Sequence, residues 1–202
     1  TNRTRNKVNA HEVDADNLKD MFEQLDVFQN PKVLVAAPSS KVLGNMLGHT
    51  DILEYFYKKG YEVMHITSKF GAIINDKKVG REEFFTTLQS WGADDTKKFV
   101  IFHYSILSEG INVPGLTHTI LLRNLPIVEM AQTIGRVIRV HKDDRAAVAE
   151  GRIPAGAFHL YKKQEGVVTM PTGYKMGNAI AARLQNVVNQ IFLEGIPPLA
   201  YC

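Results

Sequence analysis

The segment from Ala131 to His141, AQTIGRVIRVH, places Gln132, Arg136 and Arg139 in an otherwise mostly apolar stretch. On a helix these positions, four and three residues apart, share one face. No acidic partner lies within a turn of either arginine. Arginine holds phosphate through paired hydrogen bonds and keeps its charge at any ordinary pH. The pattern favours a phosphate-binding face, and the alternative is an ordinary amphipathic helix with a solvated polar side.

Gly135, beside Arg136, helps to distinguish a phosphate-binding face from a solvated one. Glycine inside a helix costs about 1 kcal/mol relative to alanine, which makes sense where another backbone or a ligand comes close. A solvated helix face has no such requirement. Gly135 therefore favours the binding interpretation and predicts a close approach at this position.

The elements that would position this segment alternate between strands and helices. Four apolar runs, VLVAA at 33–37, EVMHIT at 62–67, FVIFHY at 99–104 and HTILLR at 118–123, are typical of buried parallel strands. Helices are predicted over 51–59 and 80–91, closed by Gly60 and Gly92. The alternation predicts an α/β fold with a mainly parallel sheet and helices on its faces.

Both ends of the chain also contain helical patterns. Leu18, Met21, Phe22, Leu25 and Phe28 recur at helical spacing behind the possible caps Asp14 and Asp16, and this helix should end near Asn30 and Pro31. After a polar stretch that follows His141, AFHLY at 157–161 predicts a strand. A final helix carries the apolar stripe Ile180, Leu184, Val187, Val188, Ile191 and Phe192 and stops at Gly195.

Ligands of parallel α/β sheets gather at the carboxyl ends of the strands, here the loops after Ala37, Thr67, Tyr104 and Arg123. Polar residues in three of these loops are candidate contacts to a phosphate backbone. They are Pro38, Ser39, Ser40 and Lys41, then Thr67 and Ser68, then Tyr104 and Ser105.

The segment QTIGRVIR resembles motif VI, QxxGRxxR, of superfamily 2 helicases and translocases. The resemblance implies a RecA-like three-layer α/β/α domain in which Gln132, Arg136 and Arg139 face a nucleotide, with Arg136 as the arginine finger. SILSEGINVPGLTHTIL resembles motif V and implies nucleotide contacts for Glu109, Gly110 and Asn112, the last standing where aspartate is usual. KVLVAAPSS occupies the place of motif IV.

The resemblance covers residues 31–145, and the run from Phe99 to His141 is most similar to phage DNA helicases of the UvsW type. It implies three parts: a lead and first helix over 1–30, a helicase C-terminal domain over 31–145, and a C-terminal extension over 146–202, packed on the same domain. The implied partners are nucleic acid, DNA rather than RNA, and an N-terminal RecA-like domain of the same enzyme.

The sequence contains no GxxxxGK[ST] loop and no DExx motif, which a complete helicase needs for ATP and its metal. ATP and its Mg²⁺ would therefore be held mainly by the N-terminal RecA-like domain, and we expect no ATP hydrolysis by this chain alone. A non-catalytic RecA-like binding or regulatory module is the alternative. A flavodoxin-like or Rossmann enzyme is a third, although VAAPSSKVLG lacks its glycine-rich turn.

Charge, cysteine content and hydropathy narrow the classes of protein to which the chain can belong. The chain has 202 residues, a net charge of +3 and a pI near 8.9, which suits nucleic acid without requiring it. Cys202 is the only cysteine, so there is no internal disulfide or thiolate zinc site. No apolar run could span a bilayer, and we expect a soluble intracellular protein, cytoplasmic or nucleoid-associated, without a membrane partner.

The seven histidines are dispersed, so no metal site is expected. His65 and His103 lie in predicted strands and should be satisfied core residues. For the arginine pair, the resemblance implies that the counter-charge lies on a nucleotide outside the chain. We therefore expect Arg136 and Arg139 to be exposed and unpaired in the isolated domain.

Overall fold

The computed structural model describes residues 4–104, 113–171 and 175–191. In these residues one sheet runs in the order β4-β3-β2-β5-β1-β6-β7. Strands β2, β5, β1, β6 and β7 are mutually parallel, while β3 and β4 form an antiparallel edge. Their bounds are β1 Lys32–Ala36, β2 Glu62–Thr67, β3 Gly71–Ile74, β4 Lys77–Val79, β5 Phe99–His103, β6 His118–Leu121 and β7 Val167–Thr169. The four predicted strands are confirmed.

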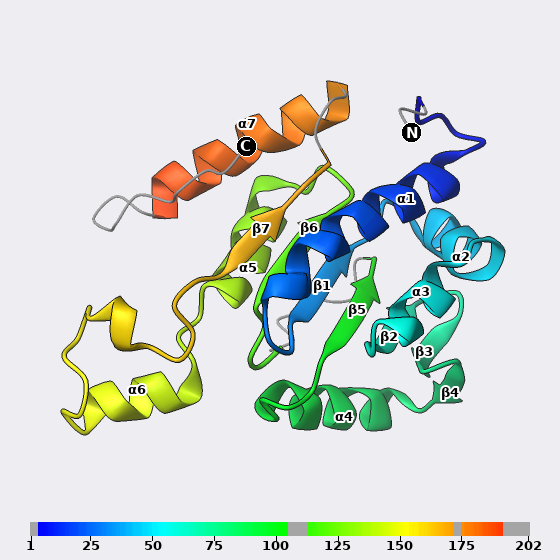
Figure 1. The fold of residues 1–202 in the computed structure, drawn as a ribbon. Coiled ribbons are helices and arrows are strands. Elements are labelled where there is room, and N and C mark those ends of the chain that lie inside the picture. The colour runs from blue at the N-terminus through cyan, green and yellow to red at the C-terminus, as the bar shows by residue number, and fades with distance from the viewer. Residues whose placement is uncertain (1–3, 105–112, 172–174, 192–202) are drawn as a thin grey trace.

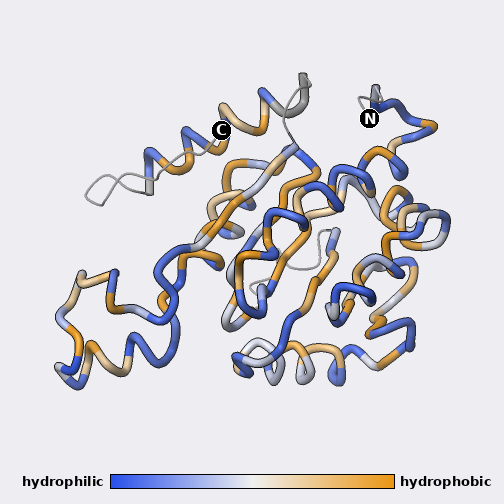
Figure 2. Tube along the Cα trace, in the orientation of Figure 1, coloured by the Kyte–Doolittle hydropathy of each residue, from blue (hydrophilic) through white to orange (hydrophobic). Residues whose placement is uncertain are grey.

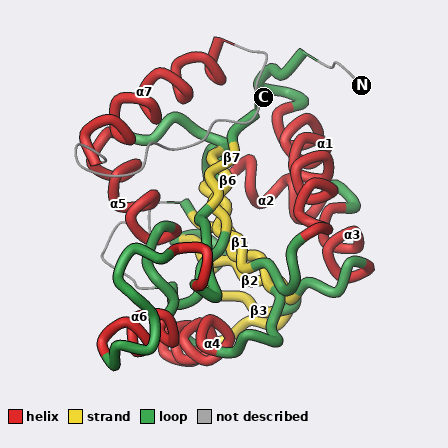
Figure 3. The backbone as a smooth tube through the Cα atoms, turned by 60° about the vertical axis from the view of Figure 1, so that its left-hand side comes forward, coloured by secondary structure: helices red, strands yellow, loops and turns green. Residues whose placement is uncertain are grey.

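Helices cover both faces of the sheet, as Figures 1 and 3 show. On one face lie α1 (Ala10–Glu23), the short 3-10 helix η1 (Gln24–Val27), α2 (Ser40–His49) and α3 (Ile52–Lys58). On the other lie α4 (Arg81–Ala93) and α5 (Ile127–Val137), with α7 (Lys175–Ile191) packed on α5. The predicted three-layer α/β/α fold with a mainly parallel sheet is therefore confirmed.

The apolar runs form strands because both faces of the sheet are buried. Val33 and Val35 of β1 face the core beneath α1, α2 and α3, whereas Leu34 and Ala36 face the opposite layer. Figure 2 shows the same strands as apolar tubes at the centre of the molecule. Leu18 and Phe22 of α1 belong to the β1 core, so the N-terminal helix packs as part of this domain.

Local chemistry explains several turns. Gly60 follows α3 at φ +77, the left-handed conformation expected of a helix-ending glycine. The segment between Phe70 and Gly80 contains the hairpin of β3 and β4. Asn75 and Asp76 form its turn with φ of 46 and 64, the residue types that favour such two-residue turns.

Three details of the prediction are wrong. The segment AFHLY contains the 3-10 helix η3 (Phe158–Leu160), and strand β7 lies further on. Helix α1 begins at Ala10 with Asn9 as N-cap, so the proposed cap Asp14 lies inside the helix, where Arg5 pairs with it at 2.8 Å. Gly92 lies within α4 instead of beyond its end.

After α5 the chain forms α6 (Lys142–Ala149) and η3 before it returns to pair β7 with β6. The residues from 142 to 166 therefore lie beside the end of α5 and the start of β6. Among the described helices, none is long and apolar enough to cross a membrane.

Candidate functional site

Helix α5 ends earlier than the arginine pattern predicts. Its last residue is Val137 and its C-cap is Ile138, so Arg136 lies in the last turn and Arg139 beyond the helix. The prediction that Gln132, Arg136 and Arg139 share one helical face is therefore wrong for Arg139. The physical reason is a lysine, Lys163, whose ammonium binds the carbonyl oxygens of Val137 and Arg139 and ends the helix.

The two arginines differ in burial. Arg136 is only 6% exposed, whereas Arg139 and Gln132 are exposed. Burial, together with the charge of Arg139, lowers the pKa of Arg136, which stays charged because an arginine does not lose its proton in proteins. Neither arginine is without a partner. The expectation of an exposed, unpaired pair is therefore wrong, except that Arg139 is exposed.

Both arginines nevertheless open on one cavity, which we call the arginine cleft. Its volume is about 410 Å³. It is lined by Gly92, Ala93, residues 113–116, Arg136, Arg139, Val140, His141, Lys142, Arg145 and Lys163. Among the described residues of this lining none carries a carboxylate and five carry a positive charge, so the described part of the wall favours an anion.

Two lysines of the cleft are held by backbone carbonyl groups. The Lys163 ammonium donates to the carbonyl oxygens of Leu116, Val137 and Arg139, and burial lowers its pKa to about 8. The Lys142 ammonium donates to the carbonyl oxygen of Ala93 at the end of α4, at 3.1 Å. These contacts join three segments around the cleft.

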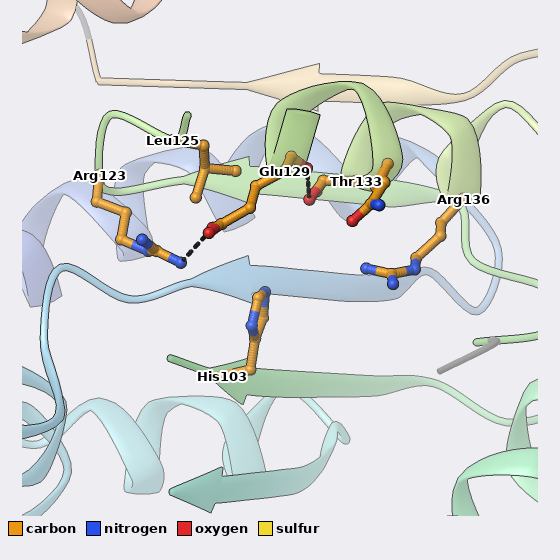
Figure 4. A pocket seen from close by; sticks show the side chains of 7 residues that line it. His103, Arg123, Leu125, Glu129, Thr133 and Arg136 are labelled. Carbon is orange, nitrogen blue, oxygen red and sulfur yellow. Dashed lines mark hydrogen bonds and ion pairs between the residues drawn. The ribbon is translucent and has the colours of Figure 1, made fainter. Parts of the chain in front are cut away.

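Arg136 also lines a second, smaller pocket under α5, which we call the His103 pocket. Figure 4 shows His103 of β5 pointing toward α5, with Arg123 on one side and Arg136 on the other. The Arg123 guanidinium pairs with Glu129 at 3.2 Å. Leu125, Gln132 and Thr133 complete the lining.

His103 is buried but not satisfied. It is 3% exposed, and neither ring nitrogen has a hydrogen-bond partner among the described residues. Burial lowers its pKa to about 3, and the charges of Arg123 and Arg136 act in the same direction. His65 is likewise buried, with an unpartnered Nδ1 among the described atoms. The prediction of two core histidines is right about burial and wrong about hydrogen bonding.

Gly135 has no close neighbour: a Cβ built on it would meet no atom within 4 Å. The predicted close approach is therefore absent from the described part of the chain. The close approach lies at Gly92 instead, whose Cβ would stand 2.4 Å from the carbonyl oxygen of Pro114. That contact brings the end of α4 against the wall of the arginine cleft.

The predicted nucleic-acid contacts lie at the carboxyl edge of the sheet. Ala36 is paired with His103 on one side and with Leu121 on the other, so β1, β5 and β6 end level with one another. Residues 38–41 follow β1, and Ser39 caps α2 by accepting a hydrogen bond from the Val42 amide at 3.1 Å. Of these four residues Lys41 is exposed, and the other three are partly buried.

The other loops at this edge are only partly described. Thr67 is 2% exposed and its hydroxyl accepts a hydrogen bond from the Phe70 amide, whereas Ser68 is exposed. Tyr104 follows β5 with the Arg123 guanidinium 4.9 Å from its ring centre. Ser105, Glu109, Gly110 and Asn112 lie outside the described residues.

The arginine cleft lies at the opposite edge. Its residues Gly92 and Gly115 precede β5 and β6, at the ends where those strands begin. Helix α5 starts after β6 and runs back across the sheet, so its arginine end reaches the edge opposite the candidate nucleic-acid loops (Figure 1). The candidate nucleic-acid loops and the arginine cleft therefore lie at opposite edges of the sheet.

One group of residues near the cleft has the composition of a metal site. Asp95, His141 and Asp143 offer ligand atoms within 4.8 Å of one another. The Lys162 ammonium, however, donates to Asp95 and, at 3.1 Å, to Asp143, and lowers the pKa of both carboxyl groups. The group is therefore an ion-pair network that ties α6 to the segment before β5.

The residues missed by the sequence are Lys142, Arg145 and Lys163. In the sequence the dilysine at 162–163 directly follows the AFHLY run, but Lys163 contacts carbonyl groups up to 47 residues away in the chain. No local pattern signals contacts of this range. Arg123 was noted only as a strand end, and its pairing with Glu129 joins β6 to α5.

The structure is an α/β domain in which Arg136 and Arg139 line one cleft. Residues 16–141 match the family model described as the helicase conserved C-terminal domain, which spans more than half of the chain. The chain therefore belongs to the helicase C-terminal domain family. No curated protein matches the sequence significantly.

Three solved structures are similar in outline. Mss116p DEAD-box helicase domain 2 bound to an RNA duplex has 14% identity and a TM-score of 0.45 over 92% of this chain and 70% of that chain. The Pyrococcus furiosus Hef helicase domain has 17% identity and a TM-score of 0.43, over 87% of this chain and 30% of that chain. The C-terminal part of the Fun30 ATPase domain has 16% identity and a TM-score of 0.45, over 84% of this chain and 44% of that chain. This chain thus spans less than half of the last two, and family membership rests on the sequence match.

Proposed function

We propose that this chain is the C-terminal motor domain of an ATP-dependent superfamily 2 DNA helicase or translocase. The observation that carries the proposal is that Arg136 and Arg139, which match the motif VI arginines, open on one cleft. Membership of the helicase C-terminal domain family supports it. In this proposal the helicase domain consists of residues 31–145 together with α1, which packs on the same core, and residues 146–202 form an extension.

In this mechanism a RecA-like N-terminal domain holds ATP and Mg²⁺, and closure of the two domains brings Arg136 and Arg139 onto the nucleotide. Arg136 acts as the arginine finger, stabilising the charge that develops on the γ-phosphate during transfer. Gln132 is exposed one turn before it on α5, where it can contact the nucleotide or its attacking water. Glu109, Gly110 and Asn112 are assigned to the nucleotide by motif V alone.

The burial of Arg136 favours a finger over a solvated surface residue. A guanidinium held among packed side chains loses less conformational freedom when it meets a phosphate than an extended surface arginine does. Desolvation also strengthens its interaction with a developing negative charge. Exposed Arg139 is better placed to meet the phosphates first, and Arg136 to stabilise the transition state.

The carboxyl edge supplies the nucleic-acid contacts in this proposal. Lys41 and Ser68 are exposed there, and Ser39, Ser40 and Tyr104 are partly exposed. Thr67 is too deeply buried for a direct contact, so Ser68 takes that role. The resemblance of residues 99–141 to phage branched-DNA helicases supports DNA as the substrate.

The decisive experiment is Arg136→Ala in the complete enzyme, the protein in which this domain is joined to its N-terminal RecA-like domain. ATP binding should change little and turnover should fall about a hundredfold or more, because the lost contact forms mainly in the transition state. Arg152→Ala is the matched control, since Arg152 is exposed and paired with Glu150 in the extension. Unchanged turnover in Arg136→Ala would show that Arg136 is not the arginine finger.

A second experiment separates the motor from a non-catalytic module. The coding sequence upstream of Thr1 should contain a GKT or GKS loop followed by a DExx motif. Hydrolysis by this chain alone should be undetectable, with or without DNA. Robust DNA-stimulated hydrolysis by the chain alone would contradict the division of labour between two domains. Competition between DNA and RNA of equal length tests the substrate.

A further inference from the structure

The turn between β2 and β3 carries an aromatic residue to which no motif assigns a role. The turn consists of residues 68–70, which are exposed, and Phe70 is 37% exposed. Strand β2 ends at Thr67, and Ile66 is paired with His103 of β5, so the turn lies just beyond the carboxyl edge of the sheet. Single exposed apolar residues are common on protein surfaces, so the surroundings of the ring must decide its role.

Hydrogen bonds fix the backbone of this turn. The Phe70 amide donates to the hydroxyl oxygen of Thr67 at 3.0 Å, and Gly71 follows the turn in the left-handed conformation, with φ +75. Gly71 is paired with Thr67 across the hairpin. Because the backbone is already ordered, Phe70 loses less conformational freedom when it binds a ligand than a residue of a freely moving loop would lose.

The Phe70 ring itself is held against helix α2. A Cβ atom built on Gly44 would stand 2.8 Å from Cε2 of Phe70 and 2.9 Å from its Cζ. Because Gly44 has no side chain, this edge of the ring can approach the helix closely. The Lys69 ammonium lies 5.3 Å from the ring centre. The ring is therefore held in place at one edge, while more than a third of the residue stays exposed, at 37%.

Positive charges lie around the exposed ring. Lys69 precedes it in the turn, and Lys41 lies on α2 one turn before Gly44, on the same face of the helix. Lys78 of β4 reaches the turn from the edge strand, because its Cε would lie 3.6 Å from a Cβ atom on Gly71. All three lysines are exposed. Lysine is depleted in protein–protein interfaces, whereas an aromatic ring within a basic surface is typical of sites for unpaired nucleic acid.

We propose that Phe70 stacks against an unpaired base, so that this edge of the domain binds a single strand. Lys41 and Lys69 contact phosphates next to that base. The inference rests on the proposed function, in which this edge contacts nucleic acid, and it names the form of the nucleic acid that is bound. Every base has a π-face, so stacking selects no sequence. A paired base inside a duplex already stacks on its neighbours and presents no free face to Phe70.

Fluorescence anisotropy of the 202-residue chain with a labelled oligothymidylate, and with an abasic strand of equal length, tests the inference at low ionic strength. Phe70→Ala should weaken binding of the oligothymidylate about tenfold or more, because stacking of one base contributes that much. The same variant should bind the abasic strand as the wild type does, since the phosphate contacts remain. Thermal unfolding of each variant verifies that it is folded.

Matched variants separate the aromatic ring from its apolar bulk. Phe70→Tyr keeps a ring for stacking and should retain the wild-type affinity for the oligothymidylate. Phe70→Leu fills the space beside Gly44 without a π-face, and it should lose affinity as Phe70→Ala does. Phe158→Ala is the control, because Phe158 is 45% exposed in η3 of the extension. It should leave the affinities for both strands unchanged.

Other outcomes would overturn the stacking role. Wild-type affinity for the oligothymidylate in Phe70→Ala would show that no base stacks on the ring. Equal losses with the oligothymidylate and the abasic strand would show that Phe70 only holds the turn and its lysines in place. An equal loss with a blunt duplex would contradict an unpaired base.

These results are distinguishable from a failure of the proposed function. If Phe70→Ala has no effect but Lys41→Gln weakens binding of both strands, the carboxyl edge binds nucleic acid and only the role of Phe70 is overturned. If Phe70→Ala retains strand binding but lowers DNA-stimulated turnover of the complete enzyme, Phe70 contacts another protein domain, which also overturns the inference. A chain that binds neither strand overturns it as well, whereas the turnover of Arg136→Ala tests the motor independently.

Discussion

The ammonium nitrogen of Lys163 lies 2.9 Å from the carbonyl oxygen of Arg139 and also binds the carbonyl oxygen of Val137. A residue of the extension thereby sets the point where α5 ends and the direction in which Arg139 leaves it. The third acceptor, the Leu116 carbonyl oxygen at 2.7 Å, joins this point to the segment before β6. The position of the motif VI arginines thus depends on a lysine outside the motif.

Lys163→Met should destabilise the chain by about 1–3 kcal/mol, because it removes a charged donor from three carbonyl groups, two of them in part-buried contacts. Chemical denaturation measures the change in the free energy of unfolding. The matched control is Lys162→Met, since Lys162 is half-exposed and its ion pairs are at the surface, where such pairs contribute at most about 1 kcal/mol. Equal losses in the two variants would contradict the role assigned to Lys163.

Alanine should have opposite effects at Gly92 and Gly135. At Gly92 the new Cβ would lie 2.4 Å from the carbonyl oxygen of Pro114, and relieving that clash should cost about 1–3 kcal/mol of stability. At Gly135 the new Cβ meets no atom within 4 Å, so helix propensity should stabilise the isolated chain by up to about 1 kcal/mol.

Thermal or chemical unfolding of both variants measures these changes. A stabilised Gly135→Ala chain that loses turnover in the complete enzyme would show that another domain or a ligand approaches Gly135. If Gly135→Ala destabilises the isolated chain, another atom must lie close to Gly135, contrary to the open surface that α5 has at this position.

The stability of the chain should fall as the pH is lowered from 7.5 to 5.5. Burial lowers the pKa of His103 to about 3 and that of His118 to about 4, whereas both titrate near 6.5 when unfolded. Below pH 6.5 the unfolded chain therefore binds more protons than the folded chain. Each histidine should cost about 1.4 kcal/mol per pH unit there, until the pH approaches its folded pKa.

Denaturation curves of His103→Leu should show a shallower loss of stability over the same pH interval, because the variant has one fewer proton to bind on unfolding. The comparison is of slopes, so it is independent of the stability that the variant has at pH 7.5. A slope equal to that of the wild type would mean that His103 is already protonated in the folded chain or titrates normally.

Lys41→Gln should weaken nucleic-acid binding uniformly across sequences and lower the slope of log affinity against log salt by about 1. Lys41 is exposed in the first turn of α2, at the carboxyl edge of the sheet. Lys58→Gln is the control, because Lys58 ends α3 near the opposite edge and pairs with Glu54 at 2.7 Å. A loss of affinity in Lys58→Gln alone would place the nucleic acid on the other edge.

Strands were predictable where burial on both faces left a continuous apolar run. The predicted and observed bounds of β2 coincide at Glu62–Thr67, and β5 and β6 begin where predicted. The same logic failed at AFHLY, because Phe158 and Leu160 are 45% and 52% exposed and form part of a 3-10 helix. A short apolar pattern does not reveal whether a partner strand exists to cover it.

By itself the sequence determined the fold class, the order of the strands along the chain and the identity of the arginine segment. These follow from burial periodicity and residue type over short stretches. Only the tertiary structure decided that α5 stops at Val137, that Arg136 is buried, and that Lys142, Arg145 and Lys163 share the cleft. Sequence patterns report on residues that are close in the chain, whereas a cavity is formed by side chains and carbonyl groups that lie far apart in it, such as Lys163 and Leu116.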